Sequence, residues 1–425
     1  MRTDSFVVPE VLSHRLGNGL TLTAAQHSST PLVHAHLAIP CLLDSDEHLA
    51  GADVLTATWA ELPAAEAFEA VGGKLTISRR RQWVILSLSC LRACIAQLEQ
   101  VLAEVTQLAP DPSGLTTARS RCAQQATLVS AHPDAAVQRA LWTAVYGHLP
   151  PLLNPAPTLP ALEQVDHAAL AAAHRQQVSP GAAHLVLIGD LTPPEALSLA
   201  ERSLGSWTGH RGRSLLEDGL RPAGRPMIEF TPKPGSRTTQ IRLVAESLPP
   251  AHPEAFTTAV VANVILGGNF SSRLNRQVRE RDGLAYRVTS TLIDQYARTM
   301  LLLELDVAHG ATAAALSVVG DNLAELAAQG PTGPELDAAV GFILGSYEQS
   351  IGSQAGLGGC LLSYVTTGVG LNLLGDLAPL LRCLTTEDVR QIFANLTPAR
   401  HWGVVAGGDT AAAAESLITR GDFVL

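Results

Sequence analysis

The sequence predicts an α+β protein made of two homologous domains, each a mostly antiparallel sheet with helices packed on one face. The 425 residues exceed the length of one ordinary domain and suit two domains of about 200 residues. A hydrophobic fraction of 46% supplies enough apolar material for two large cores. Expected strands occur in hairpin-like pairs and expected helices in runs, a pattern typical of α+β folds.

A weak internal repeat indicates a duplication. Residues 183–204 and 401–420 each read as a short apolar strand, a Gly-Asp turn and an alanine-rich helix. The two turns, at Asp190 and Asp409, lie roughly half a chain length apart. Solenoid repeats have periods of only about 20–50 residues, so this spacing indicates duplicated domains.

The other expected elements follow the same order in both halves: a strand before a helical stretch, a pair of strands, and then long helical patterns. The expected strands are 32–40, 74–78 and 82–89, followed in the second half by 240–249, 286–291 and 299–307. Apolar residues at helical spacing predict helices over 135–146 and 334–351. The Gly-, Arg-, Ser- and Pro-rich stretch 205–225 breaks this periodicity, which places the domains at 1–215 and 222–425.

The charge pattern argues against nucleic acid as a partner. The net charge is −10, and arginine carries nearly all of the positive charge because Lys74 and Lys233 are the only lysines. This usage is typical of a bacterial genome of high GC content. An acidic chain without a basic stripe does not attract phosphate backbones. The one basic run, Arg79-Arg80-Arg81, indicates either a solvated sheet edge or a contact with an acidic peptide.

The sequence predicts a cytoplasmic protein that does not enter the membrane. The N-terminal residues 1–10 contain no apolar signal core, and no apolar run reaches the roughly 18 residues that span a bilayer. The cysteines are scattered through apolar segments, which predicts buried free thiols in a reducing compartment. They are Cys41, Cys90, Cys94, Cys122, Cys360 and Cys383.

The most informative stretch is Leu266–Ser290. A helix that carries Arg279 leads into the turn Gly283-Leu284-Ala285-Tyr286, and an alternating strand follows. Together with Ser272-Arg273-Leu274, this block resembles a signature of the pitrilysin-type metalloproteases, or inverzincins, a family that includes the mitochondrial processing peptidases. The resemblance implies two homologous α+β halves per chain, which form half of a clam-shell.

The resemblance also implies a role for Arg279 and Tyr286. In the family, an arginine and a tyrosine at this spacing reach the substrate peptide near the scissile bond. The guanidinium offers a fork of donors to peptide carbonyls, and the phenol offers a donor to a developing oxyanion. The alternative interpretation is a helix-end arginine beside a core tyrosine.

The family's N-terminal zinc motif, H-x-x-E-H, is missing. If Gly51 is aligned with the glycine before the motif, Val54 and Thr58 occupy the histidine positions. Ala57 then occupies the position of the glutamate that activates water. These side chains supply no metal ligand and no general base.

The third zinc ligand of the family, a glutamate further along the chain, is also missing. No glutamate occurs between Glu104 and Glu163. Asp134 is a carboxylate in this window, but it follows Pro133 at an expected helix start, where we predict an N-cap.

One alternative metal site remains open. Residues Asp44, Glu47 and His48 can be read as D-x-x-E-H, with Asp44 in place of the first histidine. His34 and His36 alternate on the preceding strand, so they share one face and could lie nearby. The other interpretation is the acidic turn that precedes the motif in the family.

A glycine-rich run at Gly352–Gly359 lacks the Gly-Lys-Ser/Thr ending of a phosphate-binding loop. We therefore predict a hinge or a tight helix contact there.

Three functions follow from these features. The chain is predicted to be the non-catalytic subunit of a heterodimeric zinc endopeptidase, which binds a peptide substrate for a homologous zinc-bearing partner subunit. On this hypothesis the chain itself holds no cofactor, and the zinc belongs to the partner. The alternatives are a structural or peptide-binding scaffold protein without a proteolytic role, and an enzyme with a non-standard metal site.

Overall fold

The computed structural model describes residues 9–41, 43–80, 82–107, 114–209, 222–223, 225–248, 253–295, 298–407 and 410. Two mixed β-sheets, of six and five strands, have helices packed against them, which confirms the predicted α+β class. The chain forms two compact units. Unit 1 comprises Met1–Ala131, Pro151–Leu215 and Tyr347–Thr366, and unit 2 comprises His132–Pro150, Leu216–Ser346 and Thr367–Leu425.

Sheet A forms the centre of unit 1. Its strands are β1 (Val11–Arg15), β2 (Thr21–Gln26), β3 (Leu32–Pro40), β4 (Lys74–Arg80), β5 (Trp83–Leu91) and β6 (His184–Gly189). They lie in the order β1-β2-β6-β3-β5-β4. Strands β2 and β6 are parallel, and the other neighbouring pairs are antiparallel. The order leaves β4 at one edge of the sheet.

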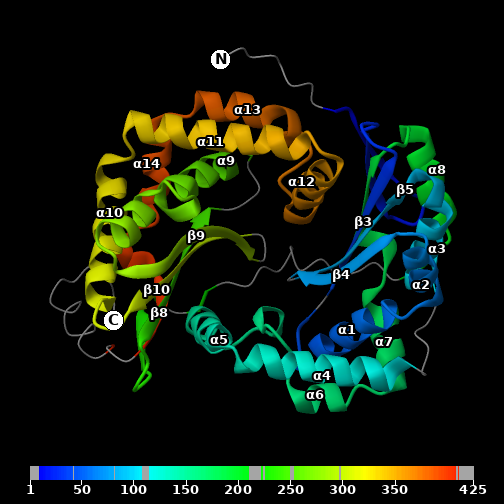
Figure 1. The fold of residues 1–425 in the computed structure, drawn as a ribbon, viewed down its shortest axis with the longest axis horizontal. Helices are drawn as coiled ribbons and strands as arrows, with labels where there is room; N and C mark the ends of the chain where they lie inside the picture. Colours follow the sequence, from blue (N-terminus) through cyan, green and yellow to red (C-terminus); the bar gives the residue numbers. More distant parts are fainter. Residues whose placement is uncertain are drawn as a thin grey trace. The chain divides into compact units, whose positions relative to one another are not determined.

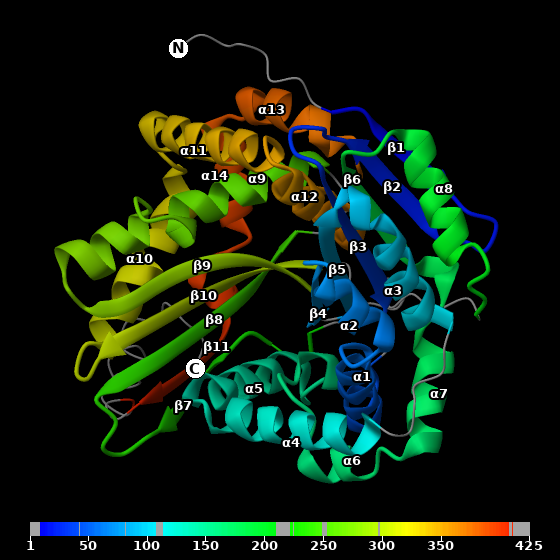
Figure 2. The ribbon, with the colours of Figure 1, turned by 45° about the vertical axis from the view of Figure 1, so that its right-hand side comes forward.

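Sheet B forms the centre of unit 2 (Figure 2). Its strands are β7 (Ile228–Pro232), β8 (Thr238–Leu248), β9 (Ala285–Gln295), β10 (Arg298–Ala308) and β11 (Trp402–Gly407), in the order β7-β11-β8-β10-β9. Only the β7–β11 pair is parallel. Strand by strand, this order and these directions match β2-β6-β3-β5-β4 of sheet A. The common topology agrees with the duplication that the sequence repeat predicts.

Sheet A has helices on both faces. The helices of unit 1 are α1 (Asp46–Trp59), α2 (Pro63–Ala70), α3 (Ile95–Gln107), α4 (Leu115–Ala131), α6 (Leu159–Glu163), α7 (His167–Gln177), α8 (Pro193–Leu204) and α12 (Gln354–Thr367). Helices α1, α2, α3 and α8 contact one face, and α12 lies against the other (Figure 1). The second face is polar at β3 and β5, where His36 hydrogen-bonds Ser87 at 2.9 Å.

The glycine-rich run lies at the contact between α12 and sheet A. A Cβ atom on Gly358 would lie only 2.9 Å from the His36 Nε2 atom, so a side chain at this position requires a shift. Gln354, at the start of α12, donates a hydrogen bond to the carbonyl of Thr30 at 2.9 Å. The run is therefore a tight helix contact, one of the two interpretations that the sequence allows. The burial beneath α12 lowers the pKa of His36 to about 4.

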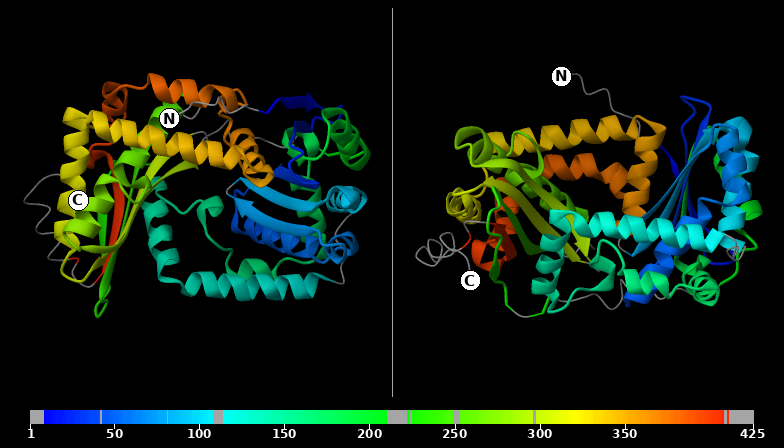
Figure 3. Two further views of the ribbon diagram at one scale, coloured as in Figure 1. Left: turned by 45° about the horizontal axis from the view of Figure 1, so that its top comes forward. Right: turned by 60° about the horizontal axis from the view of Figure 1, so that its bottom comes forward.

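Sheet B also has helices on both faces. The helices of unit 2 are α5 (Pro133–Tyr146), α9 (Pro253–Asn263), α10 (Thr312–Gln329), α11 (Gly333–Ile351), α13 (Leu373–Cys383) and α14 (Thr386–Ala394), with two π-helical segments, η5 (Val264–Gly268) and η6 (Asn275–Arg281). Helix α5 covers β8 and β11, while α9, α10, α13 and α14 lie on the opposite side (Figure 3).

The two units are not contiguous in sequence. Helix α5 precedes the predicted linker but belongs to unit 2, and α12 follows it but belongs largely to unit 1. The boundaries 1–215 and 222–425 describe the sequence repeat and stay a prediction. Most of the predicted linker and the helix expected after Asp409 lie outside the described residues. Within the described part of the chain, no helix is long and apolar enough to cross a bilayer.

Candidate functional site

The block Leu266–Ser290 is built around a close approach between η5 and β9. A Cβ atom on Gly267 would lie 2.9 Å from the Ser290 hydroxyl, so only glycine fits without a shift. The Ser290 hydroxyl donates a hydrogen bond to the carbonyl of Asn263 at 3.1 Å. The glycines before the Ser-Arg-Leu segment therefore let the helix end pack directly on the sheet. Single π-helical turns such as η5 and η6 are frequent at functional sites.

Asn275 holds the block together. Its buried side-chain amide donates to the carbonyls of Asn269 at 3.0 Å and Val288 at 3.2 Å, and to the Ser272 hydroxyl at 3.1 Å. These three bonds connect the turn before η6, the first residue of η6 and strand β9. The position of η6 on the sheet is consequently fixed by side-chain hydrogen bonds as well as by packing.

Asn275→Ala should lower the free energy of unfolding by about 2 kcal/mol, because it removes a buried donor and leaves its acceptors unpaired. Urea unfolding of the full chain measures this change. Asn395→Ala is a suitable control, since that amide is exposed, donates one long hydrogen bond of 3.5 Å to the carbonyl of Gln391, and accepts one of 3.2 Å from Arg400 at the surface. Equal losses for the two variants would contradict the role assigned to Asn275.

A tight turn joins η6 to the edge strand β9. Gly283 has a φ of +61°, a conformation that glycine adopts without a Cβ penalty. The amide of Leu284 donates to the carbonyl of Val278 at 2.8 Å, which closes the turn. Arg279 on η6 and Tyr286 on β9 are thus placed at the two ends of one rigid connection.

Tyr286 sits at a β-bulge on β9. The register pairs Asp306 with Arg287 and then Val307 with Ala285, so Tyr286 has no partner on β10. Strict alternation would place Tyr286 on the same face as the buried Val288. The bulge changes the phase of the strand, and the Tyr286 side chain is 88% exposed. The interpretation as a core tyrosine therefore does not apply.

Arg279 is exposed on η6, and its guanidinium lies 5.2 Å from the centroid of the Phe270 ring. This distance is within the range of a cation–π interaction. Phe270 itself is 66% exposed, which is unusual for an aromatic side chain. Phe270 was not among the predicted site residues, although an aromatic residue in the polar turn Asn269–Ser272 is a signal that could have identified it.

Arg273, the arginine of the Ser-Arg-Leu segment, has a structural role. Its guanidinium makes two hydrogen bonds to Glu335, at 2.7 and 2.9 Å, and lies 3.3 Å from Glu325. Glu335 also accepts from the amide and hydroxyl of Thr332, which caps the start of α11. The ion pair therefore anchors the turn before η6 to the first turn of α11.

The Arg273–Glu335 pair makes the free energy of unfolding depend on pH in the acidic range. Burial alone would raise the pKa of Glu335, but hydrogen bonds from Arg273 and Thr332 outweigh it and lower the pKa to about 2. The ion pair stabilises the fold fully when the pH is above 4.5, the ordinary pKa of a glutamate. This stabilisation is lost as the pH falls through about 2, the pKa of Glu335 in the folded protein. We expect Glu335→Gln to cost about 2 kcal/mol at neutral pH.

Urea unfolding of the wild type and Glu335→Gln at pH 7, 4 and 2.5 measures this effect. The difference in unfolding free energy between the two proteins should shrink toward the lowest pH. A difference that stays constant with pH would show that the carboxylate charge does not stabilise the fold.

The degenerate zinc motif lies on α1, in unit 1. Val54 is fully buried, and the Thr58 hydroxyl donates to the carbonyl of Leu55 at 2.7 Å. The neighbouring Asp53 pairs with Arg79 of β4 at 2.7 Å. Burial raises the pKa of Asp53, and the Arg79 charge opposes this shift. The carboxylate of Asp53 is therefore engaged in an ion pair with Arg79. The aligned motif positions, Val54, Ala57 and Thr58, supply no metal ligand.

The prediction that Asp134 is an N-cap is wrong. The N-cap of α5 is His132, whose Nδ1 accepts from the amide of Asp134 at 3.3 Å. The Asp134 carboxylate instead accepts a hydrogen bond from Arg242 of β8 at 2.8 Å and one from Gln240. This long-range attraction holds the first turn of α5 on sheet B.

The alternative metal site is only partly assembled. Asp44 and His48 lie in direct contact, and Ser45 caps α1 between them. Glu47 is exposed, and hydrogen bonds from its own amide and from Ser45 lower its pKa. His36 is engaged with Ser87 on sheet A. Across the described ranges, no group of three or more His, Cys, Asp or Glu side chains is placed to hold a metal ion.

Comparison with known proteins supports the resemblance. Residues 164–341 match the family described as "Peptidase M16 inactive domain". No curated protein matches the sequence significantly. Among solved structures, a peptidase M16 inactive domain from Pseudomonas fluorescens has a TM-score of 0.84 at 22% identity, covering 94% of this chain and 98% of that one.

Two further structures share the fold. A protease from Helicobacter pylori has a TM-score of 0.83 at 14% identity, covering 94% of this chain and 99% of that one. A conserved protein from Enterococcus faecalis has a TM-score of 0.73 at 14% identity, with the same coverage. Residues 164–341 of this chain thus match the peptidase M16 inactive-domain family, the pitrilysin-like family that its sequence resembles, and the chain as a whole has an M16-like fold.

Proposed function

We propose that this chain is the non-catalytic subunit of a heterodimeric zinc endopeptidase and positions a peptide for a homologous zinc-bearing subunit. The main support is the contrast between its two units. In unit 2, a rigid block presents Arg279 and Tyr286 to solvent. In unit 1, the motif positions Val54, Ala57 and Thr58 provide neither a ligand nor a base.

The exposed side chains suit peptide binding. The guanidinium of Arg279 offers several donors to peptide carbonyls, and Phe270 limits its rotation by cation–π contact. The phenol of Tyr286 is free to donate to an oxygen on which negative charge develops. An exposed tyrosine, phenylalanine and arginine on one short block are also the residue types enriched where proteins bind other proteins.

We place this role in the cytoplasm. Cys41, Cys90, Cys94, Cys122, Cys360 and Cys383 are all free of disulfides. Burial raises the pKa of Cys41 to about 12, so this thiol stays protonated at neutral pH. Thiols maintained in this form suit a reducing compartment.

Reconstitution with a zinc-bearing homologue from the same cells tests the proposal. Each chain is purified alone, and cleavage of a peptide library is measured by mass spectrometry for each chain and for an equimolar mixture. We expect cleavage only in the mixture, with one zinc per heterodimer. A zinc-bearing chain that is fully active alone would exclude the subunit role, and cleavage by the present chain alone would exclude its non-catalytic character.

A further inference from the structure

The segment η6, which carries Arg279, is wound more widely than an α-helix. The carbonyl of Gln277 accepts a hydrogen bond at 3.1 Å from the amide of Asp282, five residues further along the chain. In an α-helix the donor would be the amide of Arg281, four residues along. An α-helix turns by about 100° per residue, so the additional residue changes the direction in which the Arg279 side chain points.

The contact between Arg279 and Phe270 depends on this winding. Phe270 lies in the turn before η6 and Arg279 lies near the end of η6, and the guanidinium is 5.2 Å from the centroid of the ring. A change in the number of residues per turn between them would separate the two groups. Because π-helical segments are rare, we expect a contact from outside η6 to favour this winding over an α-helix.

Asn322 of α10 supplies such a contact, at the residue where η6 widens. Its Nδ2 atom donates to the side-chain oxygen of Gln277 at 2.9 Å and to the carbonyl of Val318, one turn earlier in α10, at 2.7 Å. The bond to Val318 orients the asparagine on its own helix, and the bond to Gln277 reaches across to η6. Gln277 is thus held by its side chain against α10 and by its carbonyl across the widened turn.

Asn322 is an unfavourable residue for the fold of α10. It is 2% exposed, and asparagine is a weaker helix former than alanine or leucine. Its Oδ1 atom is buried and accepts no hydrogen bond from any described residue, which destabilises the folded state. The presence of Asn322 is therefore better explained by its bond to Gln277 than by the stability of α10. The other buried residues of α10 are mainly apolar and include Ala315, Leu316, Val319, Leu323 and Leu326.

We propose that Asn322 is a positioning residue of the peptide-binding block: by holding Gln277 it keeps η6 widely wound, and it thereby directs Arg279 toward the peptide. The inference rests on the function proposed above and adds to it a residue from outside the block Leu266–Ser290. Without the Asn322 amide, the half-buried Gln277 side chain can turn to water and η6 can relax toward an α-helix. Arg279 then leaves its position beside Phe270.

A fluorine label at Phe270 tests this positioning in the isolated full chain. The protein carries para-fluorophenylalanine in place of Phe270, and its fluorine NMR resonance reports whether a guanidinium lies near the ring. Arg279→Ala gives the shift that marks a lost contact. Asn322→Leu should reproduce at least about half of this shift. It should cause no further shift in the Arg279→Ala background, because it acts through Arg279.

The melting temperature separates positioning from a merely structural role. Asn322→Leu and Asn322→Ala should not lower it, because each removes a buried polar group with an unpaired oxygen and places a better helix former in α10. If leucine is too large for the site, the alanine variant provides the same test. A lower melting temperature with an unmoved resonance would show that Asn322 only stabilises α10, and would overturn the proposal.

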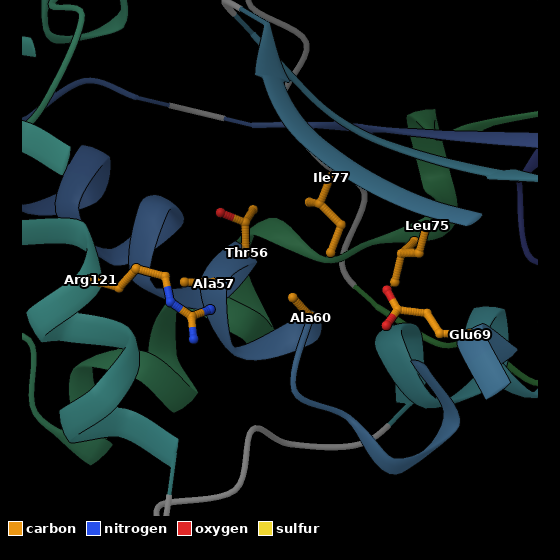
Figure 4. Close-up of a pocket in the computed structure, with 7 residues that line it drawn as sticks. All are labelled: Thr56, Ala57, Ala60, Glu69, Leu75, Ile77 and Arg121. Carbon is orange, nitrogen blue, oxygen red and sulfur yellow. The ribbon is translucent and has the colours of Figure 1, made fainter. Parts of the chain in front are cut away.

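Two control variants match the location and the chemistry of the change. Leu316→Val shortens a fully buried side chain of α10. Thr56→Val removes a hydroxyl that donates to the carbonyl of Asp53 at 2.9 Å, beside a pocket of unit 1 (Figure 4). Both should leave the resonance at Phe270 unchanged. A shift as large as that of Asn322→Leu in either control would show that the resonance responds to general changes of the fold, and would overturn the assignment.

Turnover of the reconstituted complex gives the functional readout. Asn322→Leu should lower kcat by about 10-fold, because Arg279 is displaced, and should add no loss to Arg279→Ala. Additive losses would overturn the proposal, since they would show that Asn322 does not act through Arg279. If the complex cleaves no peptide, the subunit proposal fails, and the fluorine resonance of the isolated chain still decides whether Asn322 positions Arg279.

Discussion

Arg242→Ala should lower the free energy of unfolding of unit 2 by about 3–5 kcal/mol. Arg242 is fully buried on β8, between β11 and β10. Its guanidinium lies 2.8 Å from Asp134, 3.0 Å from Asp306 and 3.2 Å from Glu304. Arg287 approaches the same carboxylates from β9. Without Arg242, the three carboxylates would have only the half-exposed Arg287 to balance their charge. Their mutual repulsion would then strongly destabilise the fold.

Hydrogen exchange across β8 and β10, measured under increasing urea, reports the stability of this unit separately from unit 1. Arg281→Ala provides the control, because Arg281 pairs with Asp282 at the surface, where solvent screens the interaction and its contribution to stability is small. A loss below about 1 kcal/mol for Arg242→Ala would mean that packing, rather than the ionic cluster, fixes α5 on sheet B.

Arg279→Ala and Tyr286→Phe should each lower the turnover of the reconstituted complex. Tyr286→Phe should lower it by about 100-fold, the usual effect of removing one donor to a developing oxyanion. Arg279→Ala should lower it because it removes the donors that position the peptide carbonyls. Both side chains are exposed and make no hydrogen bond to another described residue, so assembly and stability should change little. Phe270→Ala should give a smaller loss, because it removes only the contact that orients Arg279.

Arg276→Ala is the matched control for these variants, since Arg276 is also exposed on η6 and carries the same charge. Turnover is measured with a saturating peptide substrate, and assembly is measured by titration of one subunit into the other. Turnover that is unaffected by Arg279→Ala, or equally affected by Arg276→Ala, would contradict the assigned role.

The strands and the signature block could be predicted because their patterns are local. Alternation over 32–40 and 299–307 reflects strands with different environments on their two faces, and both form strands in the structure, as β3 and β10. The glycines before Ser272 are also a local signal, because at Gly267 the helix end lies so close to β9 that there is no room for a Cβ atom.

The features that the sequence left open or predicted wrongly depend on residues distant in sequence. The direction of Tyr286 is set by a register shift opposite Asp306 and Val307 on β10, which no pattern within β9 encodes. Asp134 was assigned from N-cap preferences, but its partner Arg242 lies 108 residues away. The placement of α5 in unit 2 and of α12 in unit 1 likewise follows from contacts between segments that share no local signal.

The most direct test of the subunit role is purification of the tagged chain from its native cells under mild conditions, followed by native mass spectrometry. The proposal predicts a one-to-one complex with a homologous chain that carries H-x-x-E-H and one zinc ion. Recovery of the chain alone or as a homodimer, under conditions in which the zinc-bearing homologue is present in the same cells, would contradict the proposal and favour a scaffold or peptide-binding role.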